Sequence, residues 1–314
     1  MEKKCIGVDV GGTTVKVGLF ESNGELLRKW EVPTRTEENG KYILCDVADS
    51  ILAVLKEENI SLDDVSGAGI GVPGPVKRDG YVPVCVNLGW KDRYPARELS
   101  DLLSGLPAQC GNDANVAALG EMWKGGGEGY EDIVMITLGT GVGGGIILNE
   151  KILTGRHGLA GEIGHIFARP EETEKCNCGS TGCLEQVASA TGIAREARRM
   201  MAASEQPSIL RQIGDGVTAK DVLDAAKAGD ALALEVMETV GHYLGVALSQ
   251  AALIVDPDIF VIGGGVSKAG QFLIDIIEKH YKAHVNISED MPIIGLAKLG
   301  NDAGIYGAAR MMLD

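Results

Sequence analysis

Two segments of this 314-residue chain carry the same pattern, in which a short apolar run, a glycine-rich turn and a second apolar run follow one another. The first segment is Asp9–Phe20 (DVGGTTVKVGLF) and the second is Thr137–Leu148 (TLGTGVGGGIIL). Each pattern predicts two strands joined by a glycine turn, and one such unit opens each half of the chain. Because a chain of this length exceeds one ordinary core, we expect two duplicated α/β domains.

The rest of the chain alternates between strand and helix patterns. Strands are expected at Ile6–Asp9, Val15–Phe20, Leu26–Val32, Gly67–Val72, Pro107–Gly111, Ile133–Leu138, Gly143–Leu148 and Ile259–Ile262. Helices are expected at Lys41–Glu58, from Asn112 or Asp113 through Trp123, at Ala190–Ala203, Ala219–Ala228, Ala231–Ile254 and Ala303–Leu313. We expect a small lobe at 1–115, with a C-terminal helix at 302–314 packing back on it, and a large lobe at 116–301.

Charge and cysteine content limit the possible partners and compartments. Acidic residues outnumber basic ones by 44 to 29, and the formal net charge is −15. With no basic cluster, nucleic acid and anionic membranes are not expected as partners, whereas ATP remains possible. No apolar run is expected to span a bilayer, and the first run is too short for a signal peptide. Of the seven cysteines, the four scattered ones are therefore interpreted as reduced residues of a cytoplasmic protein, while the other three cluster: Cys176, Cys178 and Cys183.

The first glycine turn has the composition of a phosphate-binding loop. It reads Asp9-Val10-Gly11-Gly12-Thr13-Thr14 and continues to Lys16. Glycines let backbone N–H groups approach a phosphate, threonines add hydroxyl donors, and Asp9 could hold Mg²⁺ through water. A plain β-hairpin with a Gly-Gly turn would explain the same residues.

Two further glycine turns fit a nucleotide site. Gly139-Thr140-Gly141 opens a run with five glycines from Gly139 to Gly145, which weakens a strand and is better explained by a second phosphate turn than by a crowded barrel corner. Gly264 and Gly265 follow the strand Ile259–Ile262 and could admit an adenine or ribose, although an ordinary strand-to-helix turn has the same look.

Asn112-Asp113 stands where a strand gives way to a helix. Asp113 could be a simple helix cap, or it could accept a proton from an alcohol beside a phosphate site.

The segment from Glu162 to Glu185 is the most specific motif. His165, Cys176, Cys178 and Cys183 lie close together with glycines between the cysteines. Three thiols and an imidazole at this spacing predict a structural Cys₃His zinc site rather than three unrelated thiols. With all four positions filled by protein, the metal cannot activate water. It would instead fix an irregular loop and orient Glu162, His165 and Glu185 around a polyhydroxyl ligand.

Together these motifs resemble the ROK family of sugar kinases and repressors. DVGGT, GNDANVAALGE, LGTGVGGG, GEIGH, CNCGSTGCLE and VIGGGV occur in the family's order over essentially the whole chain. The resemblance implies a two-lobed actin/hexokinase-like ATPase fold and, since the set is most similar to bacterial glucokinases, phosphorylation of glucose by Mg-ATP. It implies that Asp113 is the catalytic base. It further implies sugar contacts from Gly74, Asn87, Asn112, Asp113, Glu162, His165 and Glu185. A homodimer or homotetramer is the expected assembly.

Three alternatives remain open at this point. The chain could phosphorylate another sugar, such as N-acetylmannosamine, fructose or allose, because the shared motifs do not separate these. It could be a sugar-sensing regulator, although the first strand near residue 5 leaves no DNA-reading element in view. It could also be a non-catalytic ATPase-fold scaffold, which the intact Asp113 and glycine turns disfavour.

Overall fold

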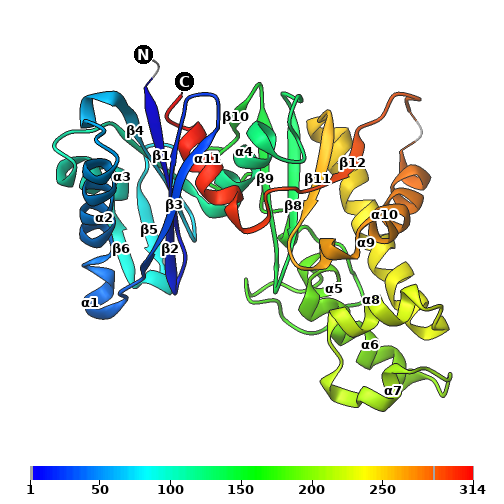
Figure 1. Cartoon of the computed structure of the whole chain (residues 1–314). Helices are drawn as coiled ribbons and strands as arrows, with labels where there is room; N and C mark the ends of the chain where they lie inside the picture. Colours follow the sequence, from blue (N-terminus) through cyan, green and yellow to red (C-terminus); the bar gives the residue numbers. More distant parts are fainter. Residues whose placement is uncertain (1–2, 286, 314) are drawn as a thin grey trace. The chain divides into compact units, whose positions relative to one another are not determined.

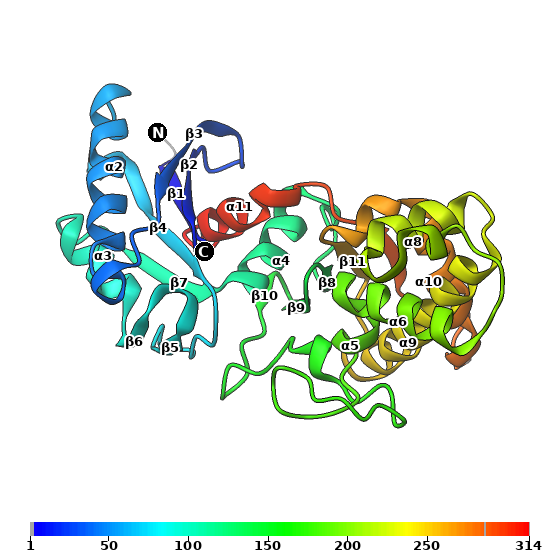
Figure 2. The ribbon, with the colours of Figure 1, turned by 90° about the horizontal axis from the view of Figure 1, so that it is seen from below.

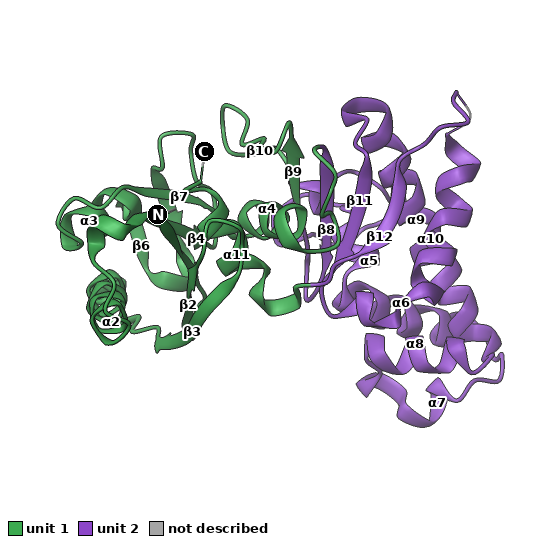
Figure 3. Ribbon diagram, turned by 45° about the horizontal axis from the view of Figure 1, so that its top comes forward, with its two compact units in different colours: residues 1–131, 145–161, 299–314 green, residues 132–144, 162–298 purple. Residues whose placement is uncertain are grey.

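The computed structural model describes residues 3–285 and 287–313. The chain forms two compact units, one made of residues 1–131, 145–161 and 299–314 and the other of residues 132–144 and 162–298 (Figure 3). Each unit is described by itself below. The lobe boundary at residue 115 stays a prediction.

Unit 1 is an α/β unit built around a five-stranded sheet. Its strands are β1 (Lys4–Val10), β2 (Thr14–Phe20), β3 (Leu26–Pro33), β4 (Val65–Val72), β5 (Val82–Cys85), β6 (Trp90–Arg93), β7 (Ala108–Asn112) and β10 (Lys151–Ile152). Its helices are α1 (Glu37–Gly40), α2 (Ile43–Glu57), α3 (Pro95–Leu102), α4 (Asp113–Lys124) and α11 (Ala303–Arg310).

The first sheet has the strand order β3-β2-β1-β4-β7. Strands β1, β2 and β3 form an antiparallel meander, while β4 and β7 run parallel to β1. Helices α2 and α3 cover one face, and α4 and α11 cover the other (Figures 1 and 2). Because both faces are covered, β4 is buried along nearly its whole length, as expected for a central parallel strand. The edge strand β3 instead alternates between exposed and half-buried residues.

Helix α11 packs unusually close to the sheet. A Cβ atom at Gly7 of β1 would lie 1.8 Å from the carbonyl oxygen of Ile305, and one at Gly69 of β4 would lie 1.8 Å from that of Ala308. Only glycine can occupy these two positions while the helix keeps this distance. Phe20 and Ile305 are fully buried in the cluster that closes this face. The contact therefore joins residues from opposite ends of the sequence.

Unit 2 combines strands with a helical layer. Its elements are β8 (Ile133–Leu138), the first residues of β9 (Val142–Leu148), α5 (Glu185–Ala188), α6 (Ala190–Ala203), α7 (Leu210–Ile213), α8 (Ala219–Lys227), α9 (Ala231–Val255), β11 (Ile259–Gly263), α10 (Gln271–His284) and β12 (Ile293–Leu296). Helix α9 is the central one, because α6, α8 and α10 all pack against it.

Helix α9 corrects one expectation from the sequence. It has 25 residues and contains an 18-residue stretch with a mean hydropathy of 1.2, so it is long and apolar enough to cross a bilayer, whereas no apolar run of that kind was expected. Its most apolar stretch is 56% buried inside the protein, in contact with α6, α8 and α10. Burial of this kind is typical of the core helix of a large domain, which explains the composition without a membrane.

The second sheet repeats the order of the first, which confirms the predicted duplication. Its order is β10-β9-β8-β11-β12, with β11 and β12 parallel to β8. In each sheet the two strands of the repeated motif are therefore neighbours. The first of them, β1 or β8, is followed across the sheet by two strands parallel to it. The predicted strands and helices are confirmed to within a few residues at their ends. The hairpin β5–β6, the helices α1, α3, α5, α7 and α10, and the strands β10 and β12 were not predicted.

Candidate active site

The first glycine turn joins β1 to β2 in unit 1. The N–H of Gly11 donates to the carbonyl oxygen of Thr14 at 3.1 Å, and the hydroxyl of Thr34 donates to the carbonyl oxygen of Gly11 at 2.7 Å. A Cβ at Gly11 would lie 2.8 Å from that Thr14 oxygen, so the turn itself requires this glycine. A Cβ at Gly12 would meet only Asn87, at 3.9 Å. Since no packing requires Gly12, open space above it is left for a ligand.

Asp9 lies at the end of β1 among other charged groups of unit 1. Burial raises the pKa of Asp9 to about 6; Lys16 opposes this shift, and Asp113 and Asp302 add to it. The Lys16 ammonium donates to the carbonyl oxygen of Asn301 at 2.8 Å. Asp302 was not predicted as part of the site, since only the fold brings residues 9 and 302 together. A buried carboxylate that feels two further carboxylates forms a region suited to a cation.

Asn112 caps helix α4 and holds Asp113 in place. Its Oδ1 accepts from the N–H groups of Ala114 and Asn115, both at 3.1 Å. Its Nδ2 donates to the carbonyl oxygen of Gly74 and to Oδ1 of Asp113, both at 3.0 Å. The cap is therefore Asn112, and Asp113 begins the helix with its carboxylate fixed by the neighbouring amide. Gly74, Asn112 and Asp113 are brought together as predicted, and their roles in sugar binding stay a prediction.

The second glycine turn, between β8 and β9, is anchored on helix α6. The carbonyl oxygen of Gly139 accepts from the N–H of Ala190 at 2.8 Å, and that of Thr140 accepts from the hydroxyl of Thr191 at 3.0 Å. A Cβ at Gly141 would lie 2.1 Å from Oε2 of Glu185, so this glycine makes room for a carboxylate. A Cβ at Gly139 would meet nothing closer than 4.0 Å, which again leaves open space.

The third glycine turn borders a cavity of about 470 Å³ in unit 2. Gly264 adopts a φ of +84° and packs against the backbone of Leu138, whereas a Cβ at Gly265 would meet nothing within 4 Å. Gly265 lines the cavity together with Val266 and residues of α8, including Leu223. Apolar walls with charged groups at the rim suit a flat heterocycle. The contribution of α8 was not predicted, because nothing in its sequence distinguishes it from a packing helix.

The four predicted metal ligands form a single cluster. The ligand atoms of His165, Cys176, Cys178 and Cys183 all lie within 4.8 Å of one another. The Sγ atoms of Cys178 and Cys183 are 3.6 Å apart, and Sγ of Cys176 is 3.8 Å from Nδ1 of His165. Tetrahedral ligands at ordinary metal–sulfur and metal–nitrogen distances are about 3.5–3.8 Å apart, so these positions fit one ion.

Glu162 and Glu185 flank this cluster. Oε2 of Glu162 lies 4.0 Å from Nε2 of His165, the ring nitrogen that does not face the thiols. Oε1 of Glu185 lies 3.5 Å from Sγ of Cys176. Both predicted carboxylates are therefore adjacent to the cluster within unit 2, and their roles in sugar binding stay a prediction.

A buried ion-pair network fixes the irregular loop that carries the cysteines. The side chain of Glu172 is fully buried and lies 2.6 Å from Arg195 and 3.3 Å from Arg199. Arg169 pairs with the buried Glu196 at 2.6 Å. Backbone bridges between Phe167 and Cys183, and between Lys175 and Thr181, complete the loop. The network was not predicted, because its partners come from the loop and from α6 without a recognisable spacing.

Comparison with known proteins agrees with this geometry. A model of the ROK family matches residues 5–314. A glucokinase from Halalkalibacterium halodurans is 46% identical over 311 residues, covering 98% of this chain and 94% of that protein. The structure of a ROK hexokinase from Thermus thermophilus gives a TM-score of 0.81 at 30% identity, covering 98% of this chain and 97% of that one. A ROK family glucokinase from Streptomyces griseus, solved with glucose and AMPPNP, gives 0.73 at 35% identity, with 98% of each chain covered. This chain belongs to the ROK family.

Proposed function

We propose that this protein is an ATP-dependent glucokinase that transfers the γ-phosphoryl group of ATP to the 6-hydroxyl of glucose. The observation that carries the proposal is the 46% identity to the glucokinase of Halalkalibacterium halodurans, which extends over nearly the full length of both chains. The Streptomyces griseus relative was solved with both glucose and a nucleotide, which supports the same pair of ligands here.

Asp113 is proposed as the catalytic base of unit 1. The transition state of phosphoryl transfer is loose, so positioning and charge neutralisation matter more than strong base catalysis. Asp113 orients the sugar hydroxyl and takes its proton late in the transfer. The amide of Asn112 suits this role, because its bonds to Gly74 and Asp113 keep the carboxylate at the start of α4. Asn87, beside Gly12, is proposed as a further sugar contact of this unit.

The glycine turns are proposed to bind the nucleotide. Gly12, Gly139 and Gly265 are glycines that the packing of the protein does not require, so the space beside them is open to a ligand. Thr13, Thr14 and Thr140 supply hydroxyl donors to phosphates, with Gly11 and Gly141 shaping the turns. The cavity beside Gly264 and Gly265 is assigned to the adenine and ribose, because its apolar walls suit a base.

Magnesium is proposed to accompany the nucleotide, held near Asp9. The donor set fits, since carboxylate oxygens are the ligands Mg²⁺ prefers and Asp9 lies near Asp113 and Asp302. When bound, the ion neutralises charge on the phosphates. Asp9 would hold the ion, and Lys16, on the neighbouring strand β2, would contribute positive charge toward the phosphates.

Glu162, His165 and Glu185 are proposed to bind sugar hydroxyls from unit 2. A carboxylate can accept hydrogen bonds from two neighbouring hydroxyls, and a site of this kind rejects sugars that lack or invert one. Glu185 suits this role because the N–H of Val142 already fixes its Oε2, so it loses little freedom on binding.

Structural zinc is proposed for His165, Cys176, Cys178 and Cys183. Three thiolates and an imidazole at these separations match the ligand set and spacing of a closed tetrahedral site. Zinc would supply cross-linking and no open coordination position. The cross-linked loop would then hold Glu162 and Glu185 in fixed positions beside the cluster.

The deciding experiment is a coupled assay with purified protein and Mg-ATP across glucose, mannose, fructose, allose, N-acetylglucosamine and N-acetylmannosamine. Glucose should give the highest kcat/KM. A higher value for another sugar would replace the acceptor and leave the kinase assignment standing, while no turnover of any sugar would remove the kinase assignment. A cytoplasmic location and assembly as a homodimer or homotetramer are proposed as well, and cell fractionation and light scattering test them.

A further inference from the structure

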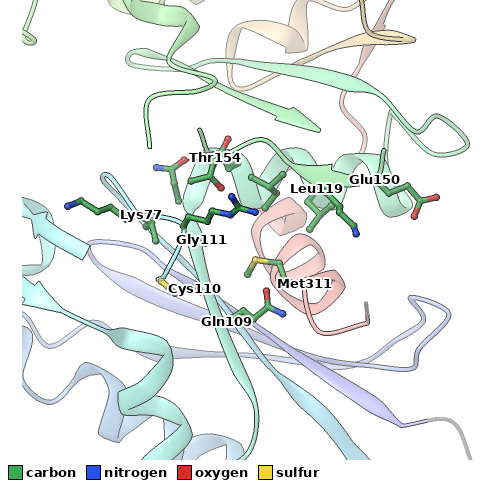
Figure 4. Close-up of a pocket in the computed structure, with 14 residues that line it drawn as sticks. Lys77, Gln109, Cys110, Gly111, Leu119, Glu150, Thr154 and Met311 are labelled. Atoms are coloured by element: carbon green, nitrogen blue, oxygen red, sulfur yellow. Dashed lines mark hydrogen bonds between the residues drawn. The ribbon is translucent and has the colours of Figure 1, made fainter. Parts of the chain in front are cut away.

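A second cavity lies in unit 1, away from the glycine turns. It has a volume of about 240 Å³ and is bounded by the outer edge of β7 and by β10 (Figure 4). Gln109, Cys110 and Gly111 contribute from β7, and Lys151 and Ile152 contribute from β10. Strand β7 is the last strand of its sheet, so backbone groups on its outer side have no partner strand. Among its lining residues only Asn112 has a part in the proposed reaction, where it holds Asp113 in place.

The rim of the cavity is positively charged, although the whole chain carries a formal charge of −15. Lys77, Arg78 and Lys151 line it, and Glu150 is the one acidic residue among its lining residues. The carboxylate of Glu150 is already paired with Arg310 at 2.8 Å. Within residues 3–285 and 287–313, Arg78 and Lys151 form no hydrogen bond or ion pair through their side chains. Two exposed cations at the rim therefore lack an anion.

Lys77 differs from these two cations. Its ammonium lies 5.0 Å from the centre of the Tyr81 ring, and Figure 4 shows its side chain extending away from the labelled residues of the cavity wall. The charge facing an occupant therefore comes from Arg78 and Lys151. An arginine and a lysine that line one cavity suit a phosphate or carboxylate group, because the guanidinium can donate two parallel hydrogen bonds.

The inner wall holds an unmet hydrogen-bonding group. Asn115 of α4 is only 6% exposed, and its Oδ1 has no hydrogen-bond partner among the described residues. A buried amide oxygen without a donor costs free energy, and because this oxygen is almost wholly covered, an occupant meets the rest of the Asn115 amide. Leu119 and Met311 supply apolar surface to the same cavity (Figure 4). The wall therefore suits a carbon skeleton that carries hydroxyls.

We propose that this cavity is a binding site for a small hydroxylated oxyanion, such as a sugar phosphate or a sugar acid. Arg78 and Lys151 bind the anionic group at the rim, and the amide of Asn115 forms a hydrogen bond with a hydroxyl at the inner wall. The volume admits a molecule of this size and is below the range typical of drug-sized ligands.

The site also has a route to the reaction, and this second step rests on the proposed function. Gly111 and Asn112 line the cavity, and Asn112 fixes the carboxylate of Asp113 through its amide. Asn115 and Leu119 belong to the helix that Asp113 begins. An occupant that bonds to Asn115 therefore acts on the same turn that positions the base, so its binding should change the rate of phosphoryl transfer.

Isothermal titration calorimetry on the full chain tests the binding step. The protein is first saturated with glucose, Mg²⁺ and AMPPNP, so that the ligands of the proposed reaction are already present. Glucose 6-phosphate, gluconate and inorganic phosphate are then titrated separately. We expect one of the two hydroxylated anions to bind with a stoichiometry of about one per chain, and inorganic phosphate to bind at least about tenfold more weakly, because it offers no skeleton for the inner wall.

The variant Arg78→Glu/Lys151→Glu should weaken that binding at least about tenfold. Its matched control, Lys56→Glu/Lys91→Glu, makes the same charge change at two exposed lysines of unit 1 and should bind like the wild type. Asn115→Ala should weaken the binding of the hydroxylated anions and leave the binding of inorganic phosphate unchanged. Absence of binding by all three anions, or equal affinity in the wild type and the Arg78/Lys151 variant, would overturn the site. Heat of binding does not require turnover, so this result is separate from the sugar assay that tests the kinase.

Discussion

Oε2 of Glu185 accepts a hydrogen bond from the N–H of Val142 at 3.0 Å, while its Oε1 lies 3.5 Å from Sγ of Cys176. One carboxylate therefore connects the second glycine turn to the cysteine cluster. Because contacts on both sides hold Glu185 in place, removal of its charge should change the affinity for a ligand without disturbing the fold.

The first prediction concerns this carboxylate. Glu185→Gln keeps the size of the side chain and an oxygen for Val142, but it removes the charge. We expect the KM for glucose to rise roughly 10- to 100-fold, since a hydrogen bond to a charged group contributes about 1.5–3 kcal/mol. The KM for ATP should change less. Steady-state kinetics with each substrate varied in turn measures both, and an unchanged glucose KM would remove Glu185 from the sugar site.

The second prediction tests Asp113. Asp113→Asn keeps an oxygen for the N–H of Ala114, which the wild-type carboxylate accepts at 2.8 Å, but it cannot take a proton. Turnover should fall roughly 10²- to 10⁴-fold with sugar binding largely retained. Calorimetric titration of glucose gives the binding, and a coupled assay gives the rate. Near-normal turnover would return Asp113 to the role of a residue at the helix start.

The third prediction is structural zinc. Metal analysis of protein purified without added metal should find about one zinc per chain. Cys178→Ala should lose the metal, lower the thermal midpoint and weaken glucose binding, because the loop before Glu185 loses its cross-link. Cys45→Ala is the matched control, since this exposed thiol lies on α2, outside the cluster. Three freely titratable thiols in a metal-free native protein would contradict the site.

The fourth prediction follows from the buried Asp9. Its pKa is raised from an ordinary 3.8 to about 6, so the folded protein holds this proton more tightly than the unfolded chain does. Protonation of Asp9 therefore stabilises the fold fully below about pH 4, and this contribution is lost as the pH rises through about 6. Asp9→Asn stays neutral at every pH. In the absence of Mg-ATP, its melting temperature should be a few degrees above that of the wild type at pH 8 and equal to that of the wild type at pH 4.

The control for this pH dependence is Asp101→Asn, at an exposed aspartate of α3. Its melting temperature should follow the wild type at both pH values. The same Asp9→Asn variant should lose most of its turnover with Mg-ATP, because the proposed metal position loses its charge. If Asp9→Asn has the melting temperature of the wild type at both pH values, the buried charge of Asp9 does not destabilise the fold.

The fifth prediction concerns the fully buried Glu172. Glu172→Gln removes the buried charge that Arg195 and Arg199 share, and breaking a buried pair is destabilising even though Arg195 keeps Glu174 and Arg199 keeps Glu196 as partners. We expect the free energy of unfolding to fall by roughly 2–4 kcal/mol. Lys220→Gln, which removes a salt bridge between exposed residues of α8, should cost under about 1 kcal/mol. Denaturant melts of both variants measure the difference, and equal midpoints would show that the network does not stabilise the loop.

Sequence patterns predicted the parts of this fold that rest on local chemistry. The strands around Gly11 and Gly139 follow from apolar runs interrupted by glycines, and the start of α4 follows from the capping residue Asn112. The four atoms of the cysteine cluster could be grouped because their spacing along the chain is short. Helix α10 could also have been predicted, since Leu273, Ile274, Ile277 and Tyr281 follow helical spacing.

Other parts could not be read from the sequence, because distant segments define them. Asp302 influences Asp9 only because α11 returns to β1, and no local pattern announces that return. The pairing of Glu172 with Arg195 and Arg199 depends on how the loop folds over α6. The cavity beside Asn115 exists only where the edges of two sheets meet the same helix. Each of these features depends on tertiary contacts between residues that are far apart in the sequence.

The close packing of α11 on Gly7 and Gly69 has a consequence for synthesis on the ribosome. Residues 303–310 complete a sheet whose first strand begins at Lys4, so this part of unit 1 has to wait for them, with Phe20 uncovered in the meantime. The residues of unit 2 all emerge before that helix does. The sheet whose strands are translated first is therefore among the last parts of the protein to be completed. A nascent chain that stalls before α11 exposes the apolar face of this sheet to chaperones.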